Sequence, residues 1–209
     1  MPKRIFLYII GLNLIAMAVV LNIRYDAGVA AFSSVMYAIS EIYRISLGTA
    51  SIICYLIFVL LQCMLSRKIT MNYILEIPLS FAFGFLTDAY DFLIPELNLS
   101  PFFCYLFFIL TMFITAMGVF LCVKTEFVLT PTDGIVNTIS EVFHISFSTV
   151  KNIFDLSLVA ISVLLCLINH TNFYGIGIGT VLSAIFIGRI IKIYERYIPV
   201  NTKNDKQQS

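Results

Sequence analysis

Four stretches of the chain contain no Asp, Glu, Lys or Arg, and they constrain the fold more than any other feature. They cover residues 5–23, 45–66, 97–123 and 156–188. An apolar run of about 18 residues or more is long enough for a helix that crosses a bilayer. Charged residues make up only 12% of the chain, against about 25% in a typical soluble domain. The sequence therefore predicts an all-α integral membrane protein with little chain left for a soluble domain.

A second feature is an internal repeat at a spacing of 100 residues. When residues 16–59 are compared with residues 116–159 without a gap, 13 of the 44 positions are identical. The matches include Ala16-Met17 and Ile39-Ser40-Glu41 of the first copy. A repeat of this length predicts an architecture built from two copies of one unit. In an apolar chain it directs attention to the interface between the copies, where repeat-built transporters hold their substrates.

Six segments are long enough to cross the membrane, three in each copy. We predict them at residues 5–23, 47–66, 71–93, 101–123, 147–169 and 173–194. The first repeat unit then covers residues 1–96 and the second covers residues 97–198, with a polar cytoplasmic tail at 199–209. Because three is an odd number, we expect the two units to insert in opposite orientations, as an inverted repeat.

Each unit also contains an extra segment after its first span, at residues 25–46 and 125–146. The uncharged run in the first of them has 14 residues, a length more typical of re-entrant or interfacial helices than of spans. The second contains the signals of a helix start, because Thr130 can cap, Pro131 suits the first position and Asp133 follows two residues later. The sequence leaves open whether these segments re-enter the membrane, lie in its interface or cross it.

The distribution of Lys and Arg supports six spans. With a cytoplasmic N-terminus, six spans place 11 of the 13 basic residues at the cytoplasmic face, all except Arg24 and Arg44. Eight spans would move Arg67, Lys68 and Lys124 to the outside and bring only Arg44 in. Because cytoplasmic loops are enriched in Lys and Arg, we expect a multi-pass cell-membrane protein with both termini in the cytoplasm. The two extra segments would then enter from opposite faces and could meet near the bilayer centre.

Asp133 and Asp155 are the sharpest candidates for a binding site. Asp133, with Thr130 beside it, could bind a cation, or the helix start could bind an anion through its free N–H groups. Alternatively, it only caps an interfacial helix. Asp155 lies inside the fifth predicted span, where an ionisable group is costly and indicates function, although it could simply pair with Lys151 one turn earlier. Ser33 is the counterpart of Asp133 in the first copy.

Other polar residues have weaker claims. Glu41 and Glu141 occupy equivalent positions and could line a symmetric path, but each could equally be a solvated charge at a helix end. Glu76 is expected to reach water at the cytoplasmic interface. His144 and His170 lack the spacing of metal ligands, so neither a metal nor a cofactor is predicted. The five cysteines form no C-x-x-C pair and are interpreted as packing residues.

Several short motifs resemble those of the YczE/YyaS/YitT-like family of bacterial membrane proteins. They are Gly11, residues 24–28, residues 45–49, residues 130–134, and the Gly-rich run at 175–180 followed by Gly188. The resemblance implies a multi-pass bacterial cell-membrane protein, but it supplies no substrate or reaction. One departure concerns the turn that is typically Ser-Pro-Trp-Asp-like in the first half, which here reads Ala30-Ala31-Phe32-Ser33. Only Asp133 could therefore serve any role of that acid.

These features favour a small transporter or channel-like permease with a site for a small solute or ion between the two repeats. Two alternatives stay open: a regulatory membrane protein that binds a partner, and a substrate-binding subunit of a larger transporter. No enzyme is expected, because the common hydrolase, zincin and P-loop motifs are absent from the sequence. The bilayer is the expected environment, and a homo-oligomer is left open. The net charge of +1 gives no indication of nucleic-acid binding.

Overall fold

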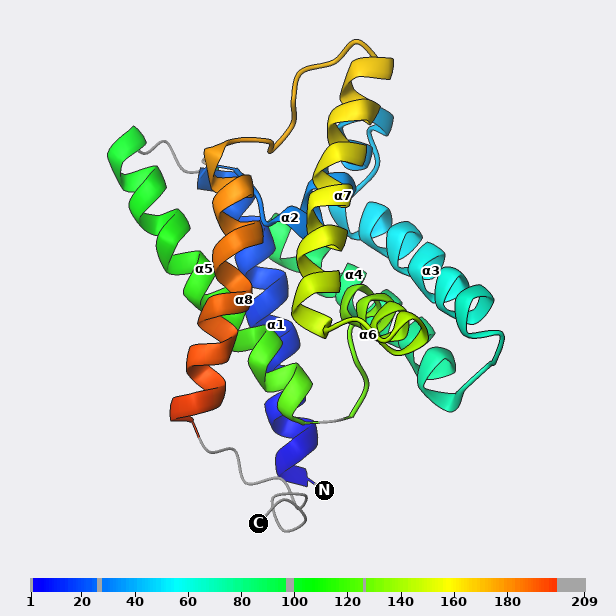
Figure 1. The fold of residues 1–209 in the computed structure, drawn as a ribbon. Helices are drawn as coiled ribbons and strands as arrows, with labels where there is room; N and C mark the ends of the chain where they lie inside the picture. Colours follow the sequence, from blue (N-terminus) through cyan, green and yellow to red (C-terminus); the bar gives the residue numbers. More distant parts are fainter. Residues whose placement is uncertain (1, 26–27, 97–99, 126, 199–209) are drawn as a thin grey trace.

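The computed structural model describes residues 2–25, 28–96, 100–125 and 127–198. These residues form α-helices and no strand, which confirms the all-α prediction (Figure 1). In chain order the helices are α1 (Pro2–Tyr25), α2 (Ala31–Tyr43), α3 (Leu47–Ser66), α4 (Met71–Leu93), α5 (Pro101–Lys124), α6 (Pro131–Phe143), α7 (Phe147–Ile168) and α8 (Ile178–Tyr197).

Four helices, α1, α3, α5 and α7, are long and apolar enough to cross a membrane. Their apolar segments are Arg4–Arg24, Leu47–Ser66, Phe102–Lys124 and Thr149–Ile168. The other two predicted spans are also long helices, since α4 has 23 residues and α8 has 20. Both carry charged side chains, among them Glu76 and Asp88 on α4 and Arg189 and Lys192 on α8. Whether these two helices cross the membrane stays a prediction.

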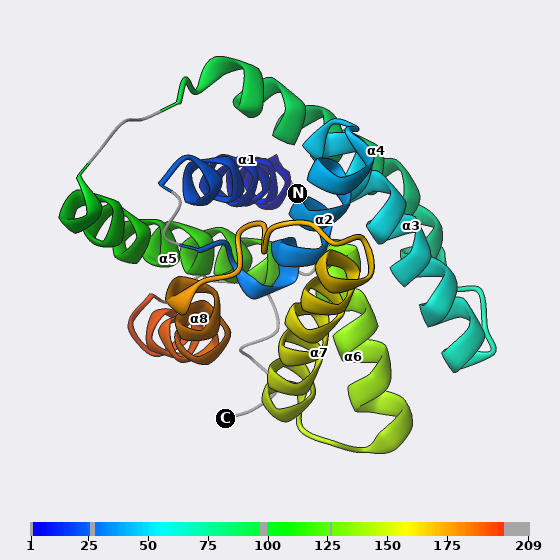
Figure 2. The same cartoon turned by 90° about the horizontal axis from the view of Figure 1, so that it is seen from above.

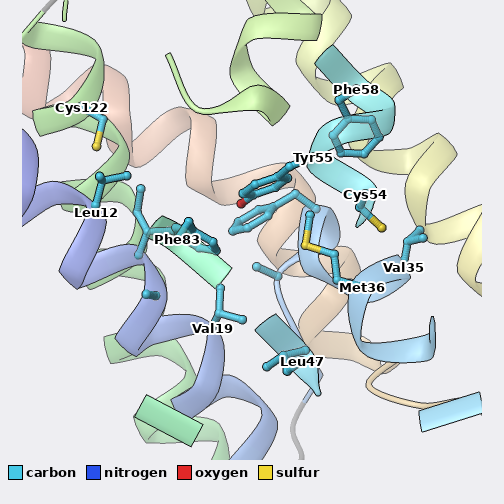
Figure 3. Close-up of a cluster of buried hydrophobic side chains, with 14 of the residues drawn as sticks. Leu12, Val19, Val35, Met36, Leu47, Cys54, Tyr55, Phe58, Phe83 and Cys122 are labelled. Carbon is cyan, nitrogen blue, oxygen red and sulfur yellow. The ribbon is translucent and has the colours of Figure 1, made fainter. Parts of the chain in front are cut away.

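The outer surfaces of the helices are apolar, as expected for contact with lipid. Large apolar side chains are exposed along the long helices, for example Leu60, Phe85, Phe102 and Ile153. A soluble monomer rarely exposes apolar surface over most of its helices. The main core lies inside, where α1, α2, α3 and α4 meet and Tyr55 packs against Phe83 with 5.2 Å between ring centroids (Figure 3).

The short helices α2 and α6 have 13 residues each. A helix of that length rises about 20 Å, less than the hydrocarbon core of about 30 Å. In both helices the first six residues are buried, and the last residues, Tyr43 and Phe143, are exposed. Each short helix therefore directs its N-terminus into the protein and its C-terminus outward.

The repeat is visible in how the short helices end. Arg44 and His144, 100 positions apart, both adopt the left-handed conformation just after the helix, with φ of 53° and 55°. In each copy the serine four residues earlier, Ser40 or Ser140, donates its hydroxyl to a carbonyl just beyond the turn. The same local sequence thus produces the same helix stop twice.

The following helices also begin in the same way. Ser46 and Ser146 are the N-cap residues of α3 and α7, and each accepts a hydrogen bond from the backbone N–H three residues later. A serine in this position satisfies one of the unpaired N–H groups of a helix start. In the first copy Asp88 of α4 adds to this cap by accepting from the Gly48 N–H at 2.7 Å.

The first helices of the two copies, α1 and α5, pack antiparallel along their lengths (Figure 2). Near one end the Arg4 Nε donates to the carbonyl oxygen of Thr125 at 2.9 Å, and towards the other Thr111 donates to Asn22. Between these contacts the backbones nearly touch, because a Cβ atom on Gly11 would lie 2.8 Å from the Gly118 carbonyl oxygen. Small residues of this kind allow helices in membranes to approach closely.

Each short helix packs against a long helix of the other copy, α2 against α7 and α6 against α3. The contacts are equivalent in the repeat. Ser162 of α7 donates its hydroxyl to the Ser34 carbonyl of α2 at 3.1 Å. At the matching positions, Gln62 of α3 lies so close to Gly134 of α6 that a Cβ there would be 2.8 Å from its Oε1 atom. The two copies are therefore interlocked.

Helix α8 begins at Ile178, whereas the sequence places the last span from residue 173. The Gly-rich run before it folds as a loop against α2. Gly175 has a φ of +63°, and its carbonyl accepts hydrogen bonds from the Val29 N–H at 2.9 Å and the Thr180 hydroxyl at 2.8 Å. A Cβ on Gly175 would lie 2.6 Å from the ring of Tyr37. Close packing and a left-handed backbone explain why glycine is used here.

Candidate functional site

The N-termini of α2 and α6 meet at a narrow cavity inside the helix bundle. The cavity has a volume of about 20 Å³, enough for one or two water molecules. Ala31 and Phe32 of α2 and Thr132 and Asp133 of α6 line it. Further lining residues come from α1, α3, α5, α7 and α8. Both copies of the repeat therefore contribute to a single cavity.

Three ionisable side chains lie together at this cavity. Lys151 Nζ lies 3.2 Å from Asp133 Oδ1 and 3.2 Å from Asp155 Oδ1. The side chains of the two acids are only 5% and 10% exposed. The ammonium group also lies 5.7 Å from the centre of the Phe32 ring, within reach of a cation–π interaction. We refer to Asp133, Lys151 and Asp155 as the charged triad.

The helix start predicted at Thr130 is present, but Thr130 acts differently from expectation. It occupies the N-cap position of α6 without accepting a backbone N–H through its side chain. Instead its hydroxyl donates to Asp133 Oδ2 at 2.9 Å. The reason is the buried carboxylate, because a charged acceptor forms a stronger hydrogen bond than a neutral partner. Thr130 thus orients Asp133 toward the cavity.

The helix ends add to the electrostatics of the cavity. Asp133 lies in the first turn of α6, where the helix dipole stabilises a negative charge. At the start of α2, the N–H of Ala31 donates to the hydroxyl of Ser183 on α8 at 3.0 Å. The two acids are therefore balanced by one ammonium group and by a helix terminus.

The structure separates the sequence candidates into two groups. Asp133, Thr130 and Asp155 lie at the cavity, and the pairing of Asp155 with Lys151 is present as well. Ser33 is buried one residue beyond the lining of α2, and its hydroxyl donates to the Ala30 carbonyl at 2.9 Å.

Glu41 and Glu141 lie away from the cavity. Both are exposed, near the outer ends of the short helices, and Glu141 accepts from Asn137 at 2.8 Å. This placement fits the alternative in which each is a solvated charge at a helix end.

Glu76 does not reach water, contrary to the expectation from the sequence. Only 2% of it is exposed, and its Oε2 atom accepts a hydrogen bond from Gln62 Nε2 at 2.7 Å. It is buried because α6 folds over α3 and α4 at this point, and Gly134 lets the helix approach the Glu76–Gln62 pair. Ser183 of the cavity was also missed. A lone Ser or Gln in a predicted span gives no signal of its own.

An apolar exterior and four helices of membrane-crossing character are the features of a helical membrane protein. Over residues 2–196 the chain matches the model of a family of unknown function, DUF6198, and it belongs to that family. No curated protein and no solved structure shows a significant match to it. The resemblance to the YczE/YyaS/YitT-like family stays a prediction.

Proposed function

We propose that the protein is a small transporter or permease of the cell membrane whose solute or ion binds at the charged triad. The observation that carries the proposal is the meeting of two short-helix N-termini, one from each copy, at a single cavity with buried charges. Ionisable groups inside a helix bundle are costly and typically mark an ion or substrate path. No catalytic role is part of this proposal.

The packing of the helices supports an inverted repeat. Antiparallel first helices and the reciprocal packing of α2 on α7 and α6 on α3 are what a two-fold axis in the membrane plane would produce. In this arrangement α4 and α8 also cross, which gives six spans with both termini in the cytoplasm. The broken or short helices of such transporters place their ends at the substrate site near the bilayer midplane.

The chemistry of the cavity supports a small charged or polar solute. Its volume of about 20 Å³ leaves no room for a large ligand in the state described. A solute that bears a charge could pair with Lys151 or with an acid of the triad, replacing one internal partner with another. Because both copies line the cavity, a rocking motion between them would open it to one side of the membrane and then the other.

Cysteine labelling tests whether the cavity is reached from both sides. In a variant whose five native cysteines are replaced, Thr132→Cys and Ser183→Cys each place a thiol at the cavity, from helices α6 and α8. Ser157→Cys on the exposed face of α7 is the matched control. We expect small membrane-impermeant thiol reagents to modify both cavity positions in right-side-out and in inside-out vesicles, and to leave the control unmodified. Labelling from one side only at both cavity positions would contradict the proposal.

A further inference from the structure

Glu76 is a buried acid outside the charged triad, and it has no cationic partner. Asp133 and Asp155 both lie 3.2 Å from the ammonium group of Lys151. Among the residues that the structure describes, Glu76 takes part in no such ion pair, although it is 2% exposed. A carboxylate that has lost its water without gaining a counter-ion is strongly disfavoured relative to the neutral acid.

The groups around Glu76 are neutral or negative on every helix packed against it. From α3, Gln62 donates to its Oε2 atom at 2.7 Å. From α6, a Cβ on Gly134 would lie 2.6 Å from its Oε1 atom, and the preceding residue, Asp133, interacts with it as a like charge. From α1, Tyr8 lies within electrostatic reach of Glu76, and its buried hydroxyl has no hydrogen-bond partner among the residues that the structure describes.

On its own helix, α4, the nearest polar contact is also neutral. The Ser80 hydroxyl donates to the main-chain carbonyl of Glu76 at 2.7 Å and leaves the carboxyl group untouched. A negative charge on Glu76 would face Asp133 with only the neutral Gln62 amide donating to it, whereas a neutral carboxylic acid would avoid this repulsion.

We propose that Glu76 is a proton-binding site and that the coupling ion of the transporter is the proton. The role of this proton in transport rests on the proposed function, whereas the protonation of Glu76 does not. In the packed state the Glu76 carboxyl carries a proton. When α6 separates from α3 and α4, the O–H bond breaks and the proton passes to water, which leaves the carboxylate. Proton uptake from water reverses the step.

The position of Glu76 links this site to the charged triad. Gly134, which contacts the Glu76–Gln62 pair, directly follows Asp133 in the first turn of α6. A movement of α6 that exposes Glu76 must therefore also move Asp133 relative to Lys151. Through this shared turn, proton release and opening of the cavity become parts of one conformational change.

A row of hydrogen-bonding side chains leads from the Glu76–Gln62 pair toward the surface. Thr138 of α6 donates to Gln62 Oε1 at 3.5 Å, and its hydroxyl lies 3.2 Å from the hydroxyl of the half-buried Tyr73. Tyr73 lies near the start of α4, next to the predicted cytoplasmic loop. Water that enters when α6 moves would meet polar groups along this route rather than an apolar barrier.

Infrared spectroscopy of the purified full chain tests the protonation directly. The carbonyl stretch of a protonated carboxylic acid is distinct from that of a carboxylate. We expect the wild type to show a protonated buried acid at neutral pH, and Glu76→Gln, which keeps the shape of the neutral acid, to lack that signal. Glu41→Gln, at an exposed position, is the matched control and should retain it. Identical wild-type and Glu76→Gln spectra at neutral pH would overturn the proposal.

Thermal unfolding in detergent distinguishes a proton bound at Glu76 from a metal cation bound there. With a proton at Glu76 the wild-type Tm should fall as pH rises through the titration of this acid, because the folded state holds the proton more tightly than the unfolded chain. Glu76→Gln should lose this dependence. A Tm that rises with Na⁺ in the wild type but not in Glu76→Gln would instead assign an alkali cation and refute the proton. If the protonated acid is present but the cavity thiols are labelled from one side only, the proton site at Glu76 is supported and the transporter function is not.

Discussion

At the residue scale, Lys151 is the one side chain of the charged triad that pairs with both of the others. It is the shared partner of Asp133 on α6 and Asp155 on its own helix. Sequence spacing reveals the second pair, four residues apart on one helix, but it cannot reveal the first, which joins two helices. For Asp155 the pairing with Lys151 is present, while its functional role stays a prediction.

Replacement of Lys151 by Met should strongly destabilise the protein. It would leave two buried carboxylates without their cation, and breaking such a pair typically costs about 3–5 kcal/mol. Unfolding in detergent by heat or denaturant measures the effect, with the exposed Lys68→Met as the control. The double variant Lys151→Met/Asp155→Asn should regain part of the loss, because only Asp133 stays charged. Equal stability of Lys151→Met and the control would show that the triad is not a stabilising ion network.

At the element scale, the position of the short helix α6 depends on a glycine in its first turn. Gly134 has no side chain, and this lets α6 pack directly on Gln62 and Glu76. The equivalent residue of the first copy is Ser34, whose carbonyl contacts Ser162. The repeat thus keeps the packing of each short helix on the other copy while the side chains at the contact differ.

Gly134→Ala should destabilise the protein and disturb the Glu76 site. The new Cβ would lie 2.6 Å from Glu76 Oε1 and 2.8 Å from Gln62 Oε1, and overpacking of this kind typically costs about 1–3 kcal/mol. Gly188→Ala is the matched control, since no atom lies within 4 Å of its added Cβ. There the better helix propensity of Ala should be neutral or stabilising by up to about 1 kcal/mol. Unfolding in detergent compares the two, and equal effects would contradict the packing described for α6.

At the scale of the whole molecule, the arrangement of the two copies forms the cavity. Antiparallel α1 and α5 and the interlocked short helices bring residues from opposite halves to one cavity. This arrangement places α4 and α8 beside the apolar helices and predicts that both cross the membrane. Four spans would put the loops at either end of α4 on the same side, whereas six would separate them.

Topology mapping tests the six-span arrangement. In the variant without native cysteines, Lys68→Cys and Glu96→Cys place thiols at the two ends of α4, and both positions are exposed. We expect an impermeant reagent to label Lys68→Cys only from the cytoplasmic side and Glu96→Cys only from the outside. Labelling of both from one side would mean that α4 does not cross, and the inverted repeat would then fail with it.

The sequence by itself determined the membrane class, the two copies of the repeat and the approximate positions of the short helices. Each of these depends on composition, on periodicity or on residues a few positions apart, so it can be read along the chain. It also singled out Asp133 and Asp155, because charges are rare in apolar surroundings.

Only the tertiary structure decided which polar groups meet. It joined Asp133 to Lys151, set Ser183 against the start of α2, and buried Glu76 beside Gln62. These partners come from different helices, and their meeting depends on how the helices pack, within one copy for two of the pairs and between the copies for Ser183 and α2. A buried charge is acceptable only where the fold supplies its partner or its proton, and the fold supplies a lysine to the acids of the cavity but no cation to Glu76.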